Sequence, residues 1–263
     1  MTMDAQMPGH ELQSQVVELR QYVLHPGERD VLINLFDREF VETQESHGMQ
    51  VIGQFRDMDD PDRFVWLRGF PDMATRASGL AGFYGGPVWR RHRDVANATM
   101  VDSDDVLLLR PARPASGFSR PARRRPPRES TGAGDGLVTA SVYSVEPSGI
   151  DSAVDYFERE VEVSLINAGA TILGYFVSDT SANNFPPLPI REGENVFVAI
   201  AGLPEATGDA VATTGRLFNG MAAAGAVQLQ QVMTLAPTAR SLLTGSSSAC
   251  AAAQLAHART PAS

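Results

Sequence analysis

The segment Gly48-Met49-Gln50-Val51-Ile52-Gly53-Gln54-Phe55 recurs in related form 121 residues later as Gly169-Ala170-Thr171-Ile172-Leu173-Gly174-Tyr175-Phe176. The same spacing places Tyr22 on Tyr143 and Phe36 on Phe157. Farther along, residues 64–72 match residues 197–205 at a spacing of 133, so the second copy carries an insertion of twelve residues around residues 183–191. A repeat of this kind sets the architecture, and the chain is predicted to contain two copies of one unit.

Local patterns divide each copy into strand, helix, strand, strand, helix and strand. In the first copy, residues 16–23 alternate as a strand does, and apolar residues at helical spacing follow between Leu32 and Phe40. Gly48 stands where the left-handed residue that ends a helix belongs. Short connections between the strands favour antiparallel pairing. We therefore expect an α+β protein made of two ferredoxin-like βαββαβ repeats.

The third strand of the first copy has bulky side chains on both faces. Alternate positions place Phe64, Trp66, Arg68 and Phe70 on one face, and Val65 and Leu67 on the other. Because neither face has the pattern of a solvated surface, we expect the two sheets to pack face to face with helices outward, as one intramolecular pseudo-dimeric α/β barrel. The predicted segments are a flexible N-terminus (1–14), domain 1 (15–112), a solvated Pro/Arg-rich linker (113–135), domain 2 (136–236) and a disordered Ala/Ser tail (237–263).

Composition excludes several classes of function. The net charge of −9 and the pI near 5.0 argue against a nucleic-acid partner, which usually needs a basic face. All 22 basic residues are arginine, so lysine Schiff bases and lysine-bearing phosphate loops are excluded. The single cysteine, Cys250, cannot form a disulfide within the chain. Without a signal pattern or a long apolar run, the expected location is the cytoplasm and no membrane contact is expected.

Several stretches resemble the NIPSNAP family, within the dimeric α/β-barrel superfamily. The resemblance rests on residues 17–22, 53–57, 59–70, 83–89 and 97–100 of the first copy and on residues 183–185 and 191–197 of the second. It implies a tandem-domain, bacterial member of that family that forms homo-oligomers. Family members lack one shared reaction. Relatives on the same barrel include cofactor-free oxygenases, haem-binding enzymes, dehydratases and ligand binders, so the fold alone does not select a function.

A comparison of the two copies indicates a ligand site in the first. Glu18, Arg20, Trp66 and Arg68 of the first copy correspond to the small residues Thr139, Ser141, Ala199 and Ala201 of the second. Unpaired charges are costly to bury, so the charged side chains must meet water, each other or an anionic ligand. Two interpretations remain open. One is a structural Glu–Arg pair that braces the barrel, and the other is a pocket built by the first copy with the second copy as a lid.

A second cluster adds aromatic and basic groups near the predicted helix that starts at Pro87. On such a helix Trp89 and His92 are neighbours. His92 is the candidate general base near neutral pH, and Glu18 is the second candidate catalytic residue. A histidine that simply packs beside a tryptophan is the alternative. The candidate substrate-binding residues are Arg20, Tyr22, Trp66, Arg68, Tyr84, Trp89 and Asn97.

These residues predict that a small hydrophobic or anionic organic molecule binds in the barrel. Catalysis without metal or nucleotide would be an oxygenation, isomerisation or elimination. No metal site is expected, because the histidines lack metal-binding spacing and residues 57–62 lack the glycine and the glutamate of an EF-hand. The alternatives are a non-catalytic binding or scaffold protein and a haem-binding barrel, since haem requires only one axial ligand and otherwise no cofactor is expected.

Overall fold

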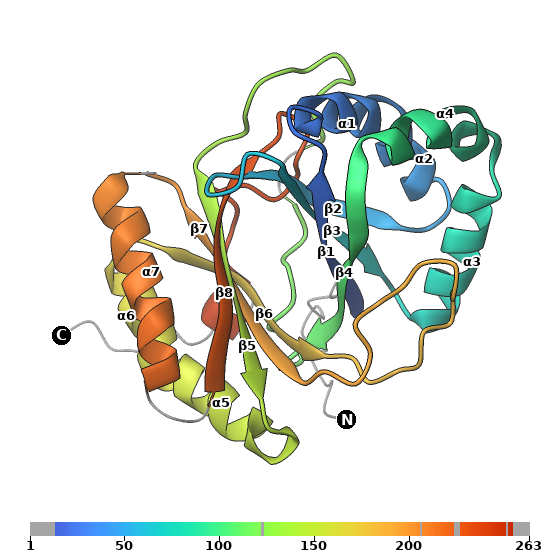
Figure 1. Cartoon of the computed structure of the whole chain (residues 1–263). Coiled ribbons are helices and arrows are strands. Elements are labelled where there is room, and N and C mark those ends of the chain that lie inside the picture. The colour runs from blue at the N-terminus through green and yellow to red at the C-terminus, as the bar shows by residue number, and fades with distance from the viewer. Residues whose placement is uncertain (1–13, 122–123, 206, 224–226, 251, 255–263) are drawn as a thin grey trace, which may run out of the picture.

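The computed structural model describes residues 14–121, 124–205, 207–223, 227–250 and 252–254. In this part of the chain, antiparallel strands close into one eight-stranded barrel in the order β1-β3-β2-β8-β5-β7-β6-β4 (Figure 1). Each half of the chain supplies four contiguous strands, β4-β1-β3-β2 and β8-β5-β7-β6. The two seams are short, with three residue pairs between β2 and β8 and three between β4 and β6. The expected closed α/β barrel is thus confirmed.

The helices of each half lie on the outside of its own strands, on opposite sides of the barrel (Figure 1). The first half consists of β1 (Val16–Leu24), α1 (Arg29–Leu35), η1 (Phe36–Phe40), α2 (Val41–Glu45), β2 (Gln50–Asp57), β3 (Arg63–Phe70), α3 (Met73–Tyr84), α4 (Pro87–Ala98) and β4 (Met100–Pro111). The second half consists of β5 (Leu137–Val145), η2 (Pro147–Gly149), α5 (Ile150–Tyr156), η3 (Phe157–Val161), α6 (Glu162–Asn167), β6 (Thr171–Ser178), β7 (Val196–Leu203), α7 (Gly208–Ala223) and β8 (Val227–Pro237).

The first helix of each half contains a π-helical turn at the same place in the repeat, η1 in one half and η3 in the other. Both helices then end at a glycine with a positive φ, 79° at Gly48 and 85° at Gly169. Because side chains other than glycine are strained in this region, the repeated glycine ends the helix at low cost. The predicted helix end at Gly48 is therefore confirmed.

The second glycine of the repeated stretch is required by a close ring. A Cβ atom at Gly53 would lie 2.5 Å from the Phe55 ring, and one at Gly174 would lie 2.8 Å from the Phe176 ring. Both glycines lie at a register shift in the strand pairing, where β2 and β6 bend into the barrel wall. The glycine and phenylalanine thus recur together because each phenyl ring packs over the bare glycine backbone.

The interior of the barrel is filled by apolar side chains from both halves. Val17, Leu19, Val65 and Leu67 of the first half join Val142, Val198 and Ile200 of the second in one buried cluster. Glu18, Arg20 and Trp66 alternate with them and point to the other side of the barrel wall, toward the helices. The side chains predicted to hold a ligand therefore do not line the barrel interior. The polar site lies between the wall and the helices of the first half.

The Pro/Arg-rich linker is not the solvated tether that its composition predicts. Arg125 is largely buried and donates to Glu45 at 2.6 Å, to the Val51 carbonyl at 2.6 Å and to the Arg240 carbonyl at 2.7 Å. Phe118 packs against Phe176 with ring centroids 4.8 Å apart. Burial is predicted from periodic apolar patterns, and the single buried side chains of the linker form no such pattern. Their burial could therefore not be predicted from the sequence.

The tail after β8 is also packed, so the expectation of disorder is wrong for residues 238–250. Arg240 is 1% exposed, donates to the Asp37 carbonyl and forms an ion pair with Glu42. The Leu243 amide donates to the Ile52 carbonyl at 2.9 Å, and the Cys250 amide donates to the Ile172 carbonyl at 2.8 Å. Residues 251 and 255–263 of the predicted tail lie outside the described residues, as do residues 1–13 of the predicted flexible N-terminus.

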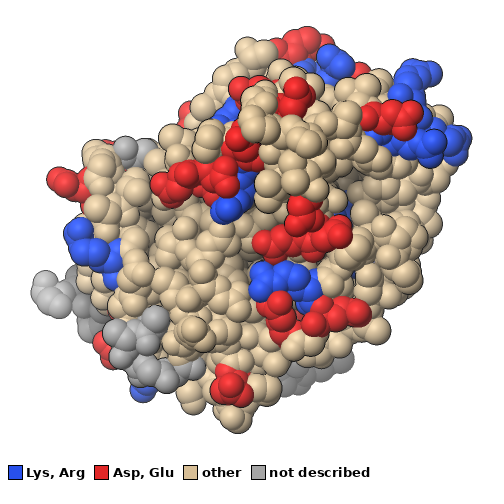
Figure 2. Space-filling view, in the orientation of Figure 1, with Lys and Arg blue, Asp and Glu red and all other residues tan. Residues whose placement is uncertain are grey.

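Surface charge on the face seen in Figure 2 is mixed, with acidic and basic side chains interspersed and no broad basic area. This distribution accords with the net charge of −9. Among the described residues, no helix is both long enough and apolar enough to span a bilayer.

Candidate functional site

A single carboxylate, that of Glu18, is surrounded by three arginines beneath the helices of the first half. Its Oε2 atom accepts from Arg20 Nη1 at 2.9 Å and from Arg68 Nη2 at 2.6 Å. Its Oε1 atom accepts from Arg76 Nε at 2.7 Å. All four side chains are fully buried. The ion pairing that the sequence left open is thus present, with one more arginine than expected.

Strand pairing and one helix start position these groups. Glu18 of β1 is the cross-strand partner of Arg68 of β3, and Arg20 is the partner of Trp66. The alternation of β1 places Glu18 and Arg20 on one face. Arg76 comes from the first turn of α3, which begins where the Asp72 carboxylate accepts from the Thr75 amide at 2.6 Å.

The charges of this cluster do not balance. Burial by itself raises the pKa of Glu18, but Arg68, Arg20 and Arg76 together hold that pKa well below its usual range, so the carboxylate stays ionised. It offsets one of three guanidinium charges. The other acceptors are neutral, because Arg68 Nη1 donates to Gln44 Oε1 at 3.0 Å and Arg20 Nε donates to the Tyr22 hydroxyl at 3.1 Å. Two positive charges remain uncompensated within the buried cluster.

Three buried donors of the same cluster have no hydrogen-bond partner, Arg20 Nη2, Arg76 Nη2 and Trp66 Nε1. An unpaired buried donor costs about 1–3 kcal/mol, and more when the group is charged. Cation–π contacts offset part of that cost, since the Arg20 guanidinium lies 5.5 Å from the Trp66 ring centroid and that of Arg68 lies 5.0 Å from it. Aromatic faces do not accept the outstanding hydrogen bonds, so the cluster is short of acceptors.

An aromatic cavity of about 30 Å³ adjoins the cluster. Its lining consists of Tyr22, Leu32, Phe36, Phe40, Gln44, Trp66, Phe83, Tyr84, Trp89, Ala96 and Met100. This volume is room for about two water molecules. Burial raises the pKa of Tyr84 even though Arg68 opposes it, so the phenol keeps its proton and can donate a hydrogen bond. The cavity therefore joins apolar walls to excess donors and positive charge.

Most of the residues predicted from the sequence converge here. Tyr22, Trp66, Tyr84 and Trp89 line the cavity, and Glu18, Arg20 and Arg68 form the charged cluster. His92 and Asn97 do not line it. Asn97 is exposed, and the His92 side chain lies 3.9 Å from Glu39 and packs near Phe40, both of η1.

Two of the predicted roles need correction. Glu18 is unsuited to proton transfer, because both of its oxygens are held by guanidiniums and its pKa is lowered. Arg68 is unsuited to ligand binding, because its Nε and both Nη atoms already donate within the protein. The donors left free belong to Arg20, Arg76 and Trp66.

The sequence comparison missed Arg76 and its partners from the second half. Arg76 Nη1 donates to Asn183 Oδ1 at 3.1 Å and to Asn184 Oδ1 at 2.7 Å. One signal was available, because Arg76 is the single charged residue of α3 and the two asparagines belong to the twelve-residue insertion. Neither observation alone shows that the two segments meet.

The corresponding region of the second half has no such cluster. Thr139 pairs with Ala201 and Ser141 with Ala199 across β5 and β7, and all four are buried. The hydroxyls of Thr139 and Ser141 lie 3.4 Å from strand carbonyls of their partners. The surrounding cluster of Phe157, Tyr175 and other apolar residues fills this region. The charged arrangement therefore belongs to the first half.

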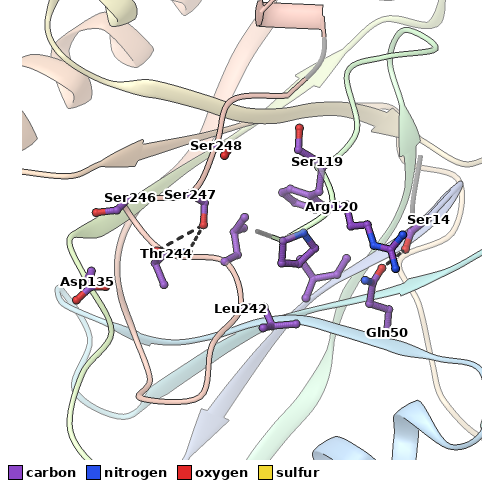
Figure 3. Close-up of a pocket in the computed structure, with 14 residues that line it drawn as sticks. Ser14, Gln50, Ser119, Arg120, Asp135, Leu242, Thr244, Ser246, Ser247 and Ser248 are labelled. Atoms are coloured by element: carbon purple, nitrogen blue, oxygen red, sulfur yellow. Dashed lines mark hydrogen bonds between the residues drawn. The ribbon is translucent and has the colours of Figure 1, made fainter. Parts of the chain in front are cut away.

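A larger cavity, of about 180 Å³, lies where the linker and the tail cross the barrel wall (Figure 3). Phe118, Leu243 and Ile52 supply apolar walls, and Ser119, Ser247 and other hydroxyl residues supply the rim. Some of these hydroxyl groups already have hydrogen-bond partners within the protein. Ser119, for example, donates to the Ala249 carbonyl at 2.7 Å. None of the buried side-chain atoms without a partner belongs to a residue of this cavity. This cavity is larger than the aromatic cavity, but the buried charges and the unpaired donors favour the aromatic cavity as the site.

Comparisons with known proteins agree with this architecture. Residues 17–115 match the NIPSNAP family model. A candidate monooxygenase from Lactobacillus acidophilus NCFM shares the fold over 90% of this chain and 98% of its own, with 11% identity and a TM-score of 0.50. No curated protein matches the sequence.

Two smaller solved structures cover one half of the chain. A NIPSNAP family protein of unknown function from Agrobacterium tumefaciens is 21% identical and covers 39% of this chain and 92% of its own, with a TM-score of 0.35. A NIPSNAP-like domain protein from Burkholderia xenovorans is 24% identical and covers 43% and 89%, with a TM-score of 0.33. The charged cluster and its cavity lie within residues 17–115, the part of the chain that matches the NIPSNAP family model.

Proposed function

We propose that this protein binds a small organic anion between the barrel wall and the helices of its first half. One observation carries the proposal: three buried guanidiniums share one buried carboxylate, and three buried donors of the same cluster, one of them on the cavity-lining Trp66, have no partner. An anionic oxygen supplies both the missing charge and the missing acceptor. Hydrogen bonds between charged partners are worth about 1.5–3 kcal/mol each, so two such bonds are enough to hold a small ligand.

The two ends of the ligand are expected to meet different surroundings. Its charged oxygens would lie at Arg20 Nη2 and Arg76 Nη2, and its apolar part would lie against Trp66, Trp89 and the phenylalanines of the cavity. An aromatic or unsaturated carboxylate has this chemistry. The cavity of about 30 Å³ is too small for such a molecule without movement of its walls.

Binding is better supported than acid–base catalysis. Tyr22 and Tyr84 are the titratable residues that line the cavity, and burial raises the pKa of Tyr84, so that phenol keeps its proton. A tyrosine hydroxyl could still donate to an enolate oxygen, so oxygenation, isomerisation and elimination stay predictions that depend on binding first. Of the histidines that the structure describes, none lines the cavity, so the cavity offers no imidazole as an axial ligand for haem.

The test uses the two tryptophans of the chain, both of which line the cavity. The full chain is titrated with benzoate, phenylacetate and salicylate while tryptophan fluorescence is followed. Neutral benzamide and benzyl alcohol serve as matched probes. We expect saturable changes with the acids alone, and Arg20→Gln and Arg76→Gln should weaken binding about ten- to a hundredfold. Arg38→Gln is the control, since this side chain is 60% exposed on η1.

The proposal is overturned if folded Arg20→Gln binds the acids as the natural chain does. It is also overturned if no acid gives a saturable change and native mass spectrometry of the purified protein finds no bound organic anion. That second outcome would favour the alternative of a non-catalytic scaffold whose buried arginines are structural.

We infer further that the two halves are ferredoxin-like repeats that arose from one unit. The strand order within each half, the π-helical turns and the paired glycines at residues 53 and 174 support this inference. If a separately produced first half assembles into a dimer with a closed barrel, the inference stands. A first half that is folded but strictly monomeric would count against it.

A further inference from the structure

We propose that residues 179–195 of the second half, here called the lid loop, open to admit the ligand of the first half and close over it. The proposal rests on the anion site proposed above. It assigns to the insertion of the second half a specific part in ligand entry, release and size selection.

The lid loop is the longest difference between the two halves. It connects β6 to β7, whereas the corresponding connection from β2 to β3 comprises only residues 58–62. The loop contains no helix or strand and lies beside α3 and β4 of the other half (Figure 1). A connection this long is not required to join two adjacent strands, and long ordered loops that pack on another part of a protein are often functional.

The tip of the lid loop contacts residues of the candidate site and of α3. Asn183 and Asn184 both accept from Arg76 Nη1, and Asn184 Nδ2 donates to the Met73 carbonyl at 2.6 Å. Phe185 stacks on Tyr84 with ring centroids 6.0 Å apart and an interplanar angle of 29°. Because Tyr84 lines the cavity and Arg76 contacts Glu18, the lid loop touches both the aromatic and the charged parts of the site.

The contacts of the tip are partly buried. Phe185, Leu188 and Ile190 pack against the core cluster of the first half, but none of residues 179–195 is fully buried and Asn184 is exposed. Segments without fully buried side chains open at lower cost than the core, while the rest of the domain stays folded. Pro186, Pro187 and Pro189 restrict the backbone of the tip, which favours movement of the tip as one unit.

The base of the lid loop is held more firmly than the tip. Arg191 forms ion pairs with Asp105 of β4, at 3.1 Å, and with Glu194. Its backbone amide donates to the Val106 carbonyl at 2.9 Å. Gly193 follows with a φ of 78°, a conformation that glycine adopts without strain. A held base and a lightly held tip allow the tip to lift from α3.

Arg76 couples the lid loop to the ligand. Its Nε atom binds Glu18, its Nη1 atom binds the two asparagines and its Nη2 atom is buried without a partner. A ligand oxygen at Nη2 would fix the guanidinium in the position that also holds Asn183 and Asn184. The closed loop in turn excludes water from the ion pair and strengthens it. In this proposal the structure shows the closed loop, in which the cavity of about 30 Å³ is too small for the ligand to enter.

The first measurement needs no ligand. Acrylamide quenching of tryptophan fluorescence is compared between the natural chain and the double variant Asn183→Ala/Asn184→Ala. We expect stronger quenching in the double variant, because Trp89 and Trp66 become accessible more often. Thr180→Ala is the matched control, because Thr180 is exposed in the same loop and contacts neither Arg76 nor Tyr84.

The second measurement follows benzoate release by stopped-flow fluorescence. The double variant should release benzoate about tenfold faster, which corresponds to about 1.4 kcal/mol. Bound benzoate should also slow amide hydrogen exchange across residues 183–190 of the natural chain. Unchanged quenching together with an unchanged release rate would overturn the lid. If quenching rises but no acid binds any form of the protein, the lid stands as a cover and the proposed function fails.

Discussion

Glu18 and Arg68 face each other across β1 and β3 with 2.6 Å between Glu18 Oε2 and Arg68 Nη2, and neither side chain is exposed. The pair lies between the barrel wall and the helices, where water cannot compensate a lost partner. Its stability contribution is asymmetric, because the cluster holds three guanidiniums and one carboxylate. Replacement of Glu18 should therefore lower the free energy of unfolding by a different amount than replacement of Arg68.

We expect Glu18→Gln to lower the free energy of unfolding by about 3–5 kcal/mol, because it leaves three buried guanidiniums without a counter-charge. Arg68→Met should cost less, about 1–3 kcal/mol, because Arg20 and Arg76 still pair with Glu18. Urea unfolding of both variants measures the difference. Arg38→Gln, which affects an exposed pair with Glu39, should change stability by less than about 1 kcal/mol. Equal losses for the first two variants would contradict the charge imbalance.

Glu162 should make stability depend on pH. Burial, with a smaller contribution from the charge of Glu158, raises its pKa from 4.5 to about 7, and its Oε1 atom has no partner. The folded state therefore holds a proton that the unfolded chain has lost, and stability falls as pH rises from about 4.5 to about 7. The loss is complete above that range and amounts to at most about 3 kcal/mol.

The neutral variant Glu162→Gln should lack this dependence, and it should be more stable than the natural chain at pH 8. Urea unfolding at pH 5, 6, 7 and 8 gives the difference between the two proteins at each pH. Glu160→Gln is the control, because Glu160 is an exposed neighbour on η3. A difference between the Glu162 variant and the natural chain that stays constant from pH 5 to 8 would show that Glu162 does not titrate there.

Removal of the tail should destabilise the barrel. A chain that ends at Pro237 loses the Arg240 ion pair with Glu42 and the buried Leu243 side chain. We expect a loss of at least about 3 kcal/mol in the free energy of unfolding, measured by urea titration. A chain that ends at Gln254 keeps these contacts and is the control. If the two truncated chains have the same free energy of unfolding, the tail does not stabilise the barrel and this prediction is wrong.

Much of the candidate site could be predicted because it lies on strands. Glu18, Arg20 and Tyr22 alternate along β1, and Trp66 and Arg68 alternate along β3, so sequence spacing places each group on one face. The comparison of the copies then singled out the first half, because Ala199 and Ala201 replace the large residues. His92 was chosen from helical spacing alone, which indicates neighbours along a helix but not the side of the helix that meets the site.

The recurrence of the two segments and the closed barrel could be predicted from the residues alone, since local constraints on the backbone recur in both halves. Gly48 and Gly169 end helices with a positive φ, and Gly53 and Gly174 leave room for phenyl rings, so the same residues recur wherever the same backbone recurs. Which face of β1 and β3 points into the barrel became clear from the three-dimensional packing. Both faces carry bulky side chains, so the alternating pattern separates the two faces but does not show which of them lies inside. The tertiary structure also decided that Arg76 meets Asn183 and Asn184, since contacts between segments more than a hundred residues apart leave no periodic signal in either segment.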